Sequence, residues 1–220
     1  MSSIRSIQFS NPMPADLAKK LGRSGIIEIL AVMWLSYDDL KADNIVTTSM
    51  RENNITEEWH IRLCRRWHSE NRASRIRVRL APVTQHEDDT MAFPQGSPPT
   101  IDFCFREWDI CNSYFGAECK NLYDHDNSHI QRYVDTGVKH YISGRYGSRS
   151  TVSTMIGYIL SGKTTEIADE LKKAISATKP HLDMVRDITS RDAQYKSRHI
   201  RVLDKESITL YHLLFDFVTS

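Results

Sequence analysis

Two stretches in the first third of the chain carry apolar residues at the three-to-four spacing of amphipathic helices. The first runs from Asp16 to about Leu40, and Gly22 and Gly25 are points at which it could divide into two helices. The second runs from Thr56 to about Arg72, with Thr56 as the expected N-cap and two glutamates in the first turn. Residues 1–74 are therefore expected to form a helical part.

The pattern then changes to the alternation that is typical of strands. Charged and apolar residues alternate over 75–83, which predicts a strand with one solvated face, and 84–100 has the composition of a loop. Short apolar runs predict strands at 101–105 and 114–120, joined by a polar connection over 106–113.

The C-terminal half is expected to mix helices and strands. One helix should begin at Asp126, Asn127 or Ser128 and end at Gly144, and another should span 164 to about 178. The apolar run 151–160 predicts a strand or a short helix, and the runs 199–203 and 208–218 predict strands. The chain is therefore expected to be an α/β protein of one domain, 1–220, in which 75–160 forms the core and 161–220 adds a helix and strands.

Composition narrows the class of protein. Of the 220 residues, 40% are hydrophobic and 26% are charged, which is typical of a folded domain. No apolar run approaches the ~18–20 residues of a membrane helix, and the N-terminus does not resemble a secretory signal, so no membrane association and a cytoplasmic location are expected. The four cysteines include no C-x-x-C pair, and Cys104 and Cys119 are expected to be buried hydrophobes. Because the net charge is only +1, any surface that binds nucleic acid must be a local one.

An acid-x-Lys tripeptide occurs three times, and its placement decides what each copy can do. Asp39–Lys41 and Glu170–Lys172 fall on predicted helices, where residues two apart point about 200° apart. Glu118 and Lys120 fall on a predicted strand, so both side chains project from the same face.

Asp102 on the preceding strand completes a candidate site. It stands between Ile101 and Phe103, and a hairpin connection would bring its carboxylate beside Glu118. Two carboxylates on adjacent strands suit Mg²⁺ or Mn²⁺, and Lys120 beside them could orient an attacking water and offset charge on a phosphoryl group. These are the parts that phosphodiester hydrolysis needs.

The order of Asp102, a hairpin, Glu118-x-Lys120 and a capped amphipathic helix resembles the core of the PD-(D/E)xK nuclease superfamily over about residues 75–160. The resemblance implies a restriction-endonuclease-like fold, with a central mixed β-sheet flanked by helices. It implies that Asp102, Glu118 and the backbone carbonyl of Cys119 bind the metal, and that Lys120 assists the nucleophilic water. Ile101 stands where the name of the motif has proline.

The resemblance also leaves positions open. Some members of the superfamily add a glutamate from an N-terminal helix, for which Glu28, Glu57 and Glu58 are candidates. Position 135 is Asp, so the Q-x-x-x-Y motif of one branch is absent, and Gln131 is expected only to contact substrate or water.

Several other features have a functional and a structural interpretation. Arg145 and Arg149 could contact phosphates or simply belong to the turn after the helix. The acidic and histidine-containing run 124–129 resembles a metal cluster, but a helix cap explains it better. Residues 157–164 fit G-x-x-x-x-G-K-T, although their Tyr-Ile-Leu continues the preceding apolar run.

The sequence thus predicts a metal-dependent nuclease that acts on nucleic acid, with DNA expected over RNA. An inactive nuclease-fold module that binds nucleic acid or a partner protein is the first alternative, and a nucleotide-binding protein is the second. A small domain with so little net charge suggests that a homodimer or a partner subunit supplies targeting. Restriction, repair and anti-phage defence are settings that the resemblance implies.

Overall fold

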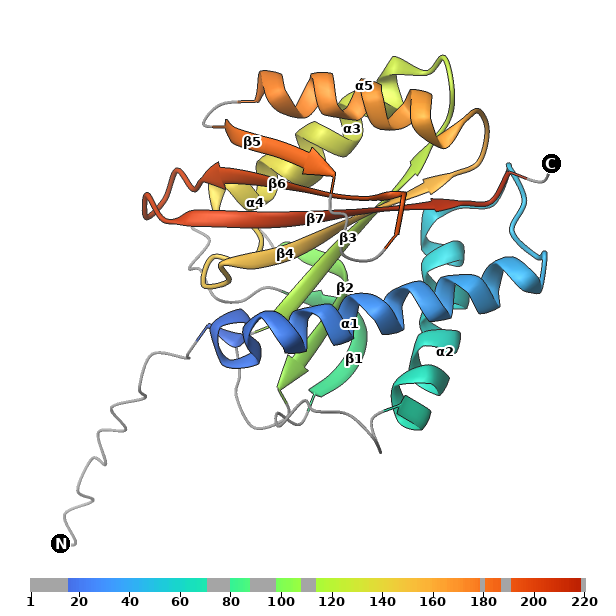
Figure 1. Ribbon diagram of the computed structural model, residues 1–220, viewed down its shortest axis with the longest axis horizontal. Coiled ribbons are helices and arrows are strands. Elements are labelled where there is room, and N and C mark those ends of the chain that lie inside the picture. Colours follow the sequence, from blue (N-terminus) through green and yellow to red (C-terminus); the bar gives the residue numbers. More distant parts are fainter. Residues whose placement is uncertain are drawn as a thin grey trace, which may run out of the picture.

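A seven-stranded mixed β-sheet with helices on both faces forms the centre of the protein, as the computed structural model shows (Figure 1). The structure describes residues 16–70, 80–87, 98–107, 114–178, 181–186 and 191–218. The helices are α1 (Leu17–Ala42), α2 (Glu52–Glu70), α3 (Asn127–Tyr133), the π-helix η1 (Val134–Val138), α4 (Lys139–Ser143) and α5 (Thr164–Ala177). The strands are β1 (Leu80–Glu87), β2 (Thr100–Glu107), β3 (Tyr114–Leu122), β4 (Val152–Ile159), β5 (His181–Arg186), β6 (Gln194–Ile200) and β7 (Ser207–Asp216).

The strand order is β1-β2-β3-β4-β7-β6-β5, and the middle of the sheet differs from its two ends. β3, β4 and β7 are parallel neighbours, whereas β1-β2-β3 and β7-β6-β5 are antiparallel. The chain therefore returns between parallel strands through helices, first through α3, η1 and α4 and then through α5. The carboxyl ends of β3, β4 and β7 consequently lie at one edge of the sheet.

The two faces of the sheet bury separate apolar clusters. α1 and α2 cover one face, and α3, α4 and α5 cover the other (Figure 1). Phe115, Ala117 and Cys119 of β3 pack in the cluster under α1 and α2, as their parity in the sequence predicts. Tyr114 and Leu122 of the same strand pack in the cluster under α3 to α5. All nine residues of β3 are buried, so the side chains that share a face with Tyr114 and Leu122 lie inside the protein.

Helix α1 follows its prediction closely. Asp16 is its N-cap and accepts a hydrogen bond from the Ala18 amide, and the helix continues through Ala42. Gly22 has a φ of 62°, which interrupts the helical geometry near the start. The expected division therefore falls at Gly22, while Gly25 lies within the continuous part.

The predicted start of α2 is wrong by four residues. The helix begins at Glu52, and Thr56 lies inside it, where its hydroxyl donates to the Glu52 carbonyl at 2.9 Å. A threonine can satisfy its hydroxyl in this way within a helix, so a threonine before an apolar stripe does not by itself mark the first turn. The correction matters because it adds Glu52 to the helix.

Two predicted boundaries in the sheet also need correction. β1 continues through Glu87, so 84–87 is strand and not loop, and Pro82 is accommodated because β1 is an edge strand. Of the strand predicted at 75–83, residues 75–79 lie outside the described residues. The run 199–203 is strand only to Ile200, where β6 ends, and β5 was not predicted at all.

The helical segment after β3 begins and ends as predicted. Asp126 is the N-cap of α3, accepting from the Ser128 amide, and Gly144 ends α4 in the left-handed conformation with a φ of 80°. Between them, η1 inserts a π-helical turn. The cap interpretation of the run 124–129 is thus confirmed for Asp126, and His125 is exposed.

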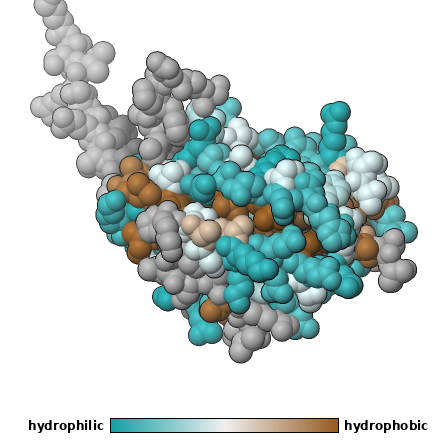
Figure 2. Space-filling model, turned by 90° about the horizontal axis from the view of Figure 1, so that it is seen from above, coloured by the Kyte–Doolittle hydropathy of each residue, from teal (hydrophilic) through white to brown (hydrophobic). Residues whose placement is uncertain are grey.

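The surface seen from the α5 side is largely hydrophilic, with a band of hydrophobic side chains across its middle (Figure 2). Over the described residues, none of the helices has the length and apolar character that crossing a membrane requires. Cys104 and Cys119 are both fully buried, as expected.

Candidate active site

Asp102 of β2 and Glu118 and Lys120 of β3 meet on the face of the sheet that α3, η1 and α4 cover. The Lys120 ammonium donates to Glu118 Oε1 at 2.7 Å and lies 3.7 Å from Asp102 Oδ2. Asp102 Oδ2 in turn accepts a hydrogen bond from the Cys119 amide at 2.9 Å. The antiparallel pairing of β2 with β3 produces this arrangement, which is the convergence that the sequence predicts.

A fourth charged residue, Glu52, joins the cluster from the first turn of α2. Its Oε1 lies 3.2 Å from the Lys120 ammonium, and its Oε2 accepts from the Asn121 amide at 3.0 Å. Arg132 of α3 donates to the same Oε1 at 3.1 Å and is half exposed. Glu52 therefore connects the buried lysine to an arginine at the surface.

Of the glutamates on α1 and α2, Glu52 is the one that contacts Lys120 in the described structure, whereas the sequence offered Glu28, Glu57 and Glu58 as candidates. Glu57 is exposed, Glu58 pairs with Arg62 at 2.8 Å, and Glu28 lies on α1. Within the part of the chain that the structure describes, the carboxylates in contact with Lys120 are those of Asp102, Glu118 and Glu52. Glu52 was missed because α2 was expected to begin at Thr56. The sequence feature that indicates Glu52 is an acidic residue at the start of a helix, where the helix dipole favours a carboxylate.

Burial dominates the electrostatics of the cluster. Glu118 and Lys120 are each 4% exposed. Burial raises the pKa of Glu118 to about 8, although the Lys120 ammonium beside it acts in the opposite direction. Burial also raises the pKa of Asp102. Burial alone would lower the pKa of Lys120, but the carboxylates of Glu118, Asp102 and Glu52 outweigh it and raise that pKa. Three carboxylates therefore surround the Lys120 ammonium, and Arg132 adds a second positive charge at Glu52.

The oxygen atoms of the cluster fit a hard cation. Glu118 Oε2 is buried and has no hydrogen-bond partner among the described residues. The Cys119 carbonyl, next to it in sequence, accepts from the Lys120 ammonium at 2.6 Å. No described group of three or more His, Cys, Asp and Glu side chains is placed to hold a metal ion. Mg²⁺ is commonly held by one or two carboxylates completed by water, so Asp102, Glu118 and the Cys119 carbonyl are a suitable donor set.

The π-helix η1 lies directly over this cluster. A Cβ atom added to Gly137 would lie 2.3 Å from Met155 Cε and 3.9 Å from Glu118 Cγ. Gly137 therefore packs against Met155, whose side-chain end would have to move to admit a larger residue. Single π-helical turns are frequent at functional sites. The turn in η1 and the charged cluster therefore indicate the same place in the fold.

The three residues predicted to contact nucleic acid are all exposed. Gln131 lies on α3 beside Arg132 and hydrogen bonds to Asp135. Arg145 and Arg149 lie in the turn after α4. Burial, followed by the positive charges of Arg145 and Lys120, lowers the pKa of His140 to about 4. Among the described arginines, Arg132, which the sequence did not indicate as a site residue, contacts the cluster through Glu52.

The nucleotide-binding interpretation of 157–164 has no support in the fold. Gly157 lies inside β4, paired with Lys120 and Leu214, so it cannot open a phosphate-binding loop after the strand. A Cβ atom there would lie 2.4 Å from Leu122 Cδ1, which explains the glycine by packing. Lys163 pairs with Glu166 on the surface.

Comparison of the chain with protein-family models, with curated proteins and with solved structures gave no match in any of the three.

Proposed function

We propose that this protein is a metal-dependent nuclease of the PD-(D/E)xK type, with a restriction-endonuclease-like core, which hydrolyses phosphodiester bonds, with DNA as the expected substrate. The observation that carries the proposal is the convergence of Asp102, Glu118 and Glu52 on Lys120, with Glu118 Oε2 left unpaired. The order of β2, a connection, β3 and the capped helix α3, followed by the parallel strand β4, supports it. This is the order on which the resemblance in the sequence rests.

Each group in the cluster would have a distinct task. Asp102, Glu118 and the Cys119 carbonyl would hold Mg²⁺ or Mn²⁺, which supplies a water of lowered pKa and polarises the phosphoryl oxygen. Lys120, kept protonated by three carboxylates, would orient that water and offset charge on the phosphoryl group. Glu52 would hold Lys120 in place. Arg132 and Arg145 would bind neighbouring phosphates from the surface, and the exposed Gln131 and Arg149 would add further contacts to the substrate.

The burial of the cluster favours a second candidate function. With Glu118 and Lys120 only 4% exposed, the cluster could be a structural ion network in a nuclease-fold module that no longer cuts. Such a module would bind nucleic acid or a partner protein. A homodimer or a partner subunit, and a role in restriction, repair or anti-phage defence, remain compatible with either function.

A metal-dependent cleavage assay separates the two. Purified protein is incubated with labelled single-stranded and duplex DNA and with RNA, with Mg²⁺, with Mn²⁺ or with EDTA. We expect cleavage that needs the metal and falls at least about a hundredfold in Asp102→Asn and in Lys120→Ala, because removing one group that stabilises a transition state costs a factor of about 10²–10³. Arg132→Ala should weaken substrate binding with a smaller change in rate.

The chain provides a matched control for these variants. Lys172→Ala changes the lysine of a second acid-x-Lys tripeptide, which is exposed on α5, and it should leave cleavage unchanged. Cleavage that persists in purified Lys120→Ala would refute the assignment of the site. Binding without cleavage by the wild-type protein under every metal condition would favour the inactive module.

A further inference from the structure

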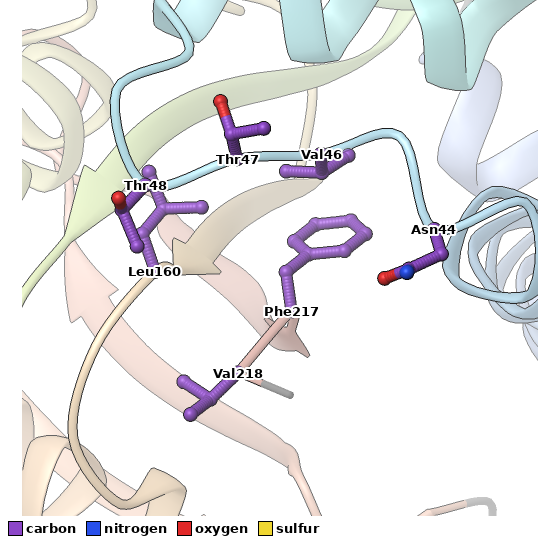
Figure 3. A pocket seen from close by; sticks show the side chains of 7 residues that line it. All are labelled: Asn44, Val46, Thr47, Thr48, Leu160, Phe217 and Val218. Carbon is purple, nitrogen blue, oxygen red and sulfur yellow. The ribbon is translucent and has the colours of Figure 1, made fainter. Parts of the chain in front are cut away.

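A pocket of about 330 Å³ lies at the edge of the sheet where the parallel strands end (Figure 3). Leu160 follows the last residue of β4, and Phe217 and Val218 follow β7. The opposite wall is the connection between α1 and α2. The lining residues are Asn44, Val46, Thr47, Thr48, Leu160, Phe217 and Val218. Crevices outside the carboxyl ends of parallel strands are a common place for ligands in open α/β sheets.

The lining combines one aromatic ring with neutral hydrogen-bonding groups. The Phe217 ring stands in the middle of the lining residues, and the Asn44 amide reaches toward the pocket from the far end (Figure 3). Edge-to-face contact with Tyr37 at 5.4 Å and tilted contact with Tyr158 at 6.1 Å fix the position of the Phe217 ring. Asn44 has a φ of 51°, a conformation that asparagine tolerates better than most residues.

The charges around the pocket disfavour an anion. None of the seven side chains that line it, all within the described residues, is charged. Asp216 precedes Phe217 in the chain, and its side chain accepts a hydrogen bond from Thr164. A phosphate placed here would meet no cation among the lining residues. A flat, neutral ring with hydrogen-bonding edges suits the pocket better, since it can stack on Phe217 and pair with the amide and hydroxyl groups.

The pocket and the charged cluster are joined by one continuous segment, 44–52. Thr48, in the pocket wall, accepts a hydrogen bond from the Tyr123 hydroxyl at 3.1 Å through its carbonyl. Two residues on, the Met50 carbonyl accepts from the Asn121 side chain at 3.1 Å. The segment then enters α2 at Glu52, which contacts Lys120 and the Asn121 amide. A nucleic acid held at the cluster by its phosphates would therefore have this pocket close by along the end of β3.

We propose that the pocket receives an unpaired nucleobase of the nucleic acid substrate, stacked on Phe217 and hydrogen bonded by Asn44 with Thr47 or Thr48. This inference rests on the proposed function and specifies its substrate: a strand with an unpaired base beside the phosphodiester bond that is cut. A base inside a duplex could not enter without leaving its stack.

Binding experiments with and without bases test the inference. A fluorescein-labelled single-stranded oligonucleotide and an abasic oligonucleotide of the same length are titrated with protein in Ca²⁺, and fluorescence anisotropy gives the two affinities. We expect Phe217→Leu to weaken binding of the base-containing strand about tenfold, since stacking on an aromatic side chain contributes on that order per base, and to leave the abasic strand unaffected. Phe217→Tyr should keep the wild-type affinity because it keeps the ring.

A second variant keeps the test valid if Phe217→Leu does not fold. Asn44→Gly removes the amide while glycine accepts the positive φ, and it should lower affinity for the base-containing strand by a smaller factor. Leu203→Ala, on an exposed turn away from the pocket, should change neither affinity. Equal weakening of both strands, or no change in either, would overturn the inference. If the pocket variants lose affinity only for the base-containing strand, and the wild-type protein never cleaves, the pocket assignment holds and the nuclease proposal is refuted.

Discussion

Two groups of buried polar side chains lie on the same side of the sheet, and they are built differently. The cluster on β2 and β3 is charged and contains an oxygen, Glu118 Oε2, with no partner in the described structure. The other group is a chain of neutral hydrogen bonds in which His199, Ser197, His212 and Tyr133 link β6 and β7 to α3. The comparison distinguishes a polar group in which the buried atoms have hydrogen-bond partners from one in which a buried atom has none.

The neutral chain satisfies its own atoms. Ser197 Oγ lies 2.9 Å from His199 Nε2 and 2.8 Å from His212 Nε2, and His212 Nδ1 lies 2.9 Å from the Tyr133 hydroxyl. Burial, and then His199, lowers the pKa of His212 to about 3, so the imidazole stays neutral near pH 7. No atom of these four side chains is among the unpaired buried atoms of the described residues. This chain of hydrogen bonds therefore links β6 and β7 to α3 without requiring a ligand.

The charged cluster has the opposite character. Three carboxylates surround one ammonium, and burial raises the pKa of both Glu118 and Asp102. Proteins normally pair buried polar groups, so an unpaired carboxylate oxygen in such a cluster calls for an explanation. A cation that completes the cluster gives one, and this contrast with the neutral chain is the main structural argument for a metal site.

The largest expected effect comes from removing the buried cation. Lys120→Met leaves three carboxylates without their ammonium, and breaking a buried ion pair from one side costs about 3–5 kcal/mol. We expect the free energy of unfolding, measured in urea, to fall by about that amount without metal. Mg²⁺ well above its dissociation constant should restore about 2–3 kcal/mol, because a ligand that binds only the folded state stabilises it.

The control for this variant is Lys172→Met, which changes an exposed lysine on α5 and should leave stability nearly unchanged. If Lys120→Met unfolds like the wild type, or if Mg²⁺ stabilises neither variant, the cluster does not need a cation and the comparison fails.

A smaller effect is expected in the neutral chain. Ser197→Ala removes the hydroxyl that both His199 and His212 contact, and a hydrogen-bonding group lost from a buried partner costs about 1–3 kcal/mol. Thermal and urea unfolding measure the loss, with Ser143→Ala, an exposed serine of α4, as the matched control. Mg²⁺ should not restore stability in Ser197→Ala beyond its effect on the wild type. Specific rescue by Mg²⁺ would show that the two polar groups are coupled.

The two groups also differ in how far the sequence predicts them. Strand parity places Glu118 and Lys120 on one face, and a hairpin places Asp102 beside them, so periodicity alone predicts the core of the charged cluster. Glu52 could not be found in this way, since it depends on where α2 begins. In the sequence Thr56 has the features of an N-cap, but in the structure its hydroxyl donates to the Glu52 carbonyl within the helix.

The neutral chain escaped prediction for a different reason. His199 and His212 lie in mixed apolar and polar runs near the end of the sequence, and both are buried. Their connection through Ser197 depends on the pairing of β6 with β7, because Ser197 lies opposite Leu210 and His199 opposite Ile208. Tertiary pairing of this kind, like the strand β5 and the extension of β1, carries no local signal in the sequence.

The pH dependence of metal binding is the smallest expected effect when it is taken per pH unit, and it tests the comparison most directly. A metal needs the carboxylate form of Glu118, whose pKa is raised to about 8, so protons compete with the metal below that pH. The apparent Mg²⁺ affinity should therefore rise by about tenfold per pH unit up to about pH 8 and then level off, a gain of about 1.4 kcal/mol per unit. Calorimetric titration between about pH 6 and about pH 9 measures both this affinity and the proton released on binding. Glu118→Gln should bind Mg²⁺ more weakly and with little dependence on pH over this range. A wild-type affinity that does not change with pH would mean that Glu118 is not the ligand, and the unpaired oxygen would then lose its explanation.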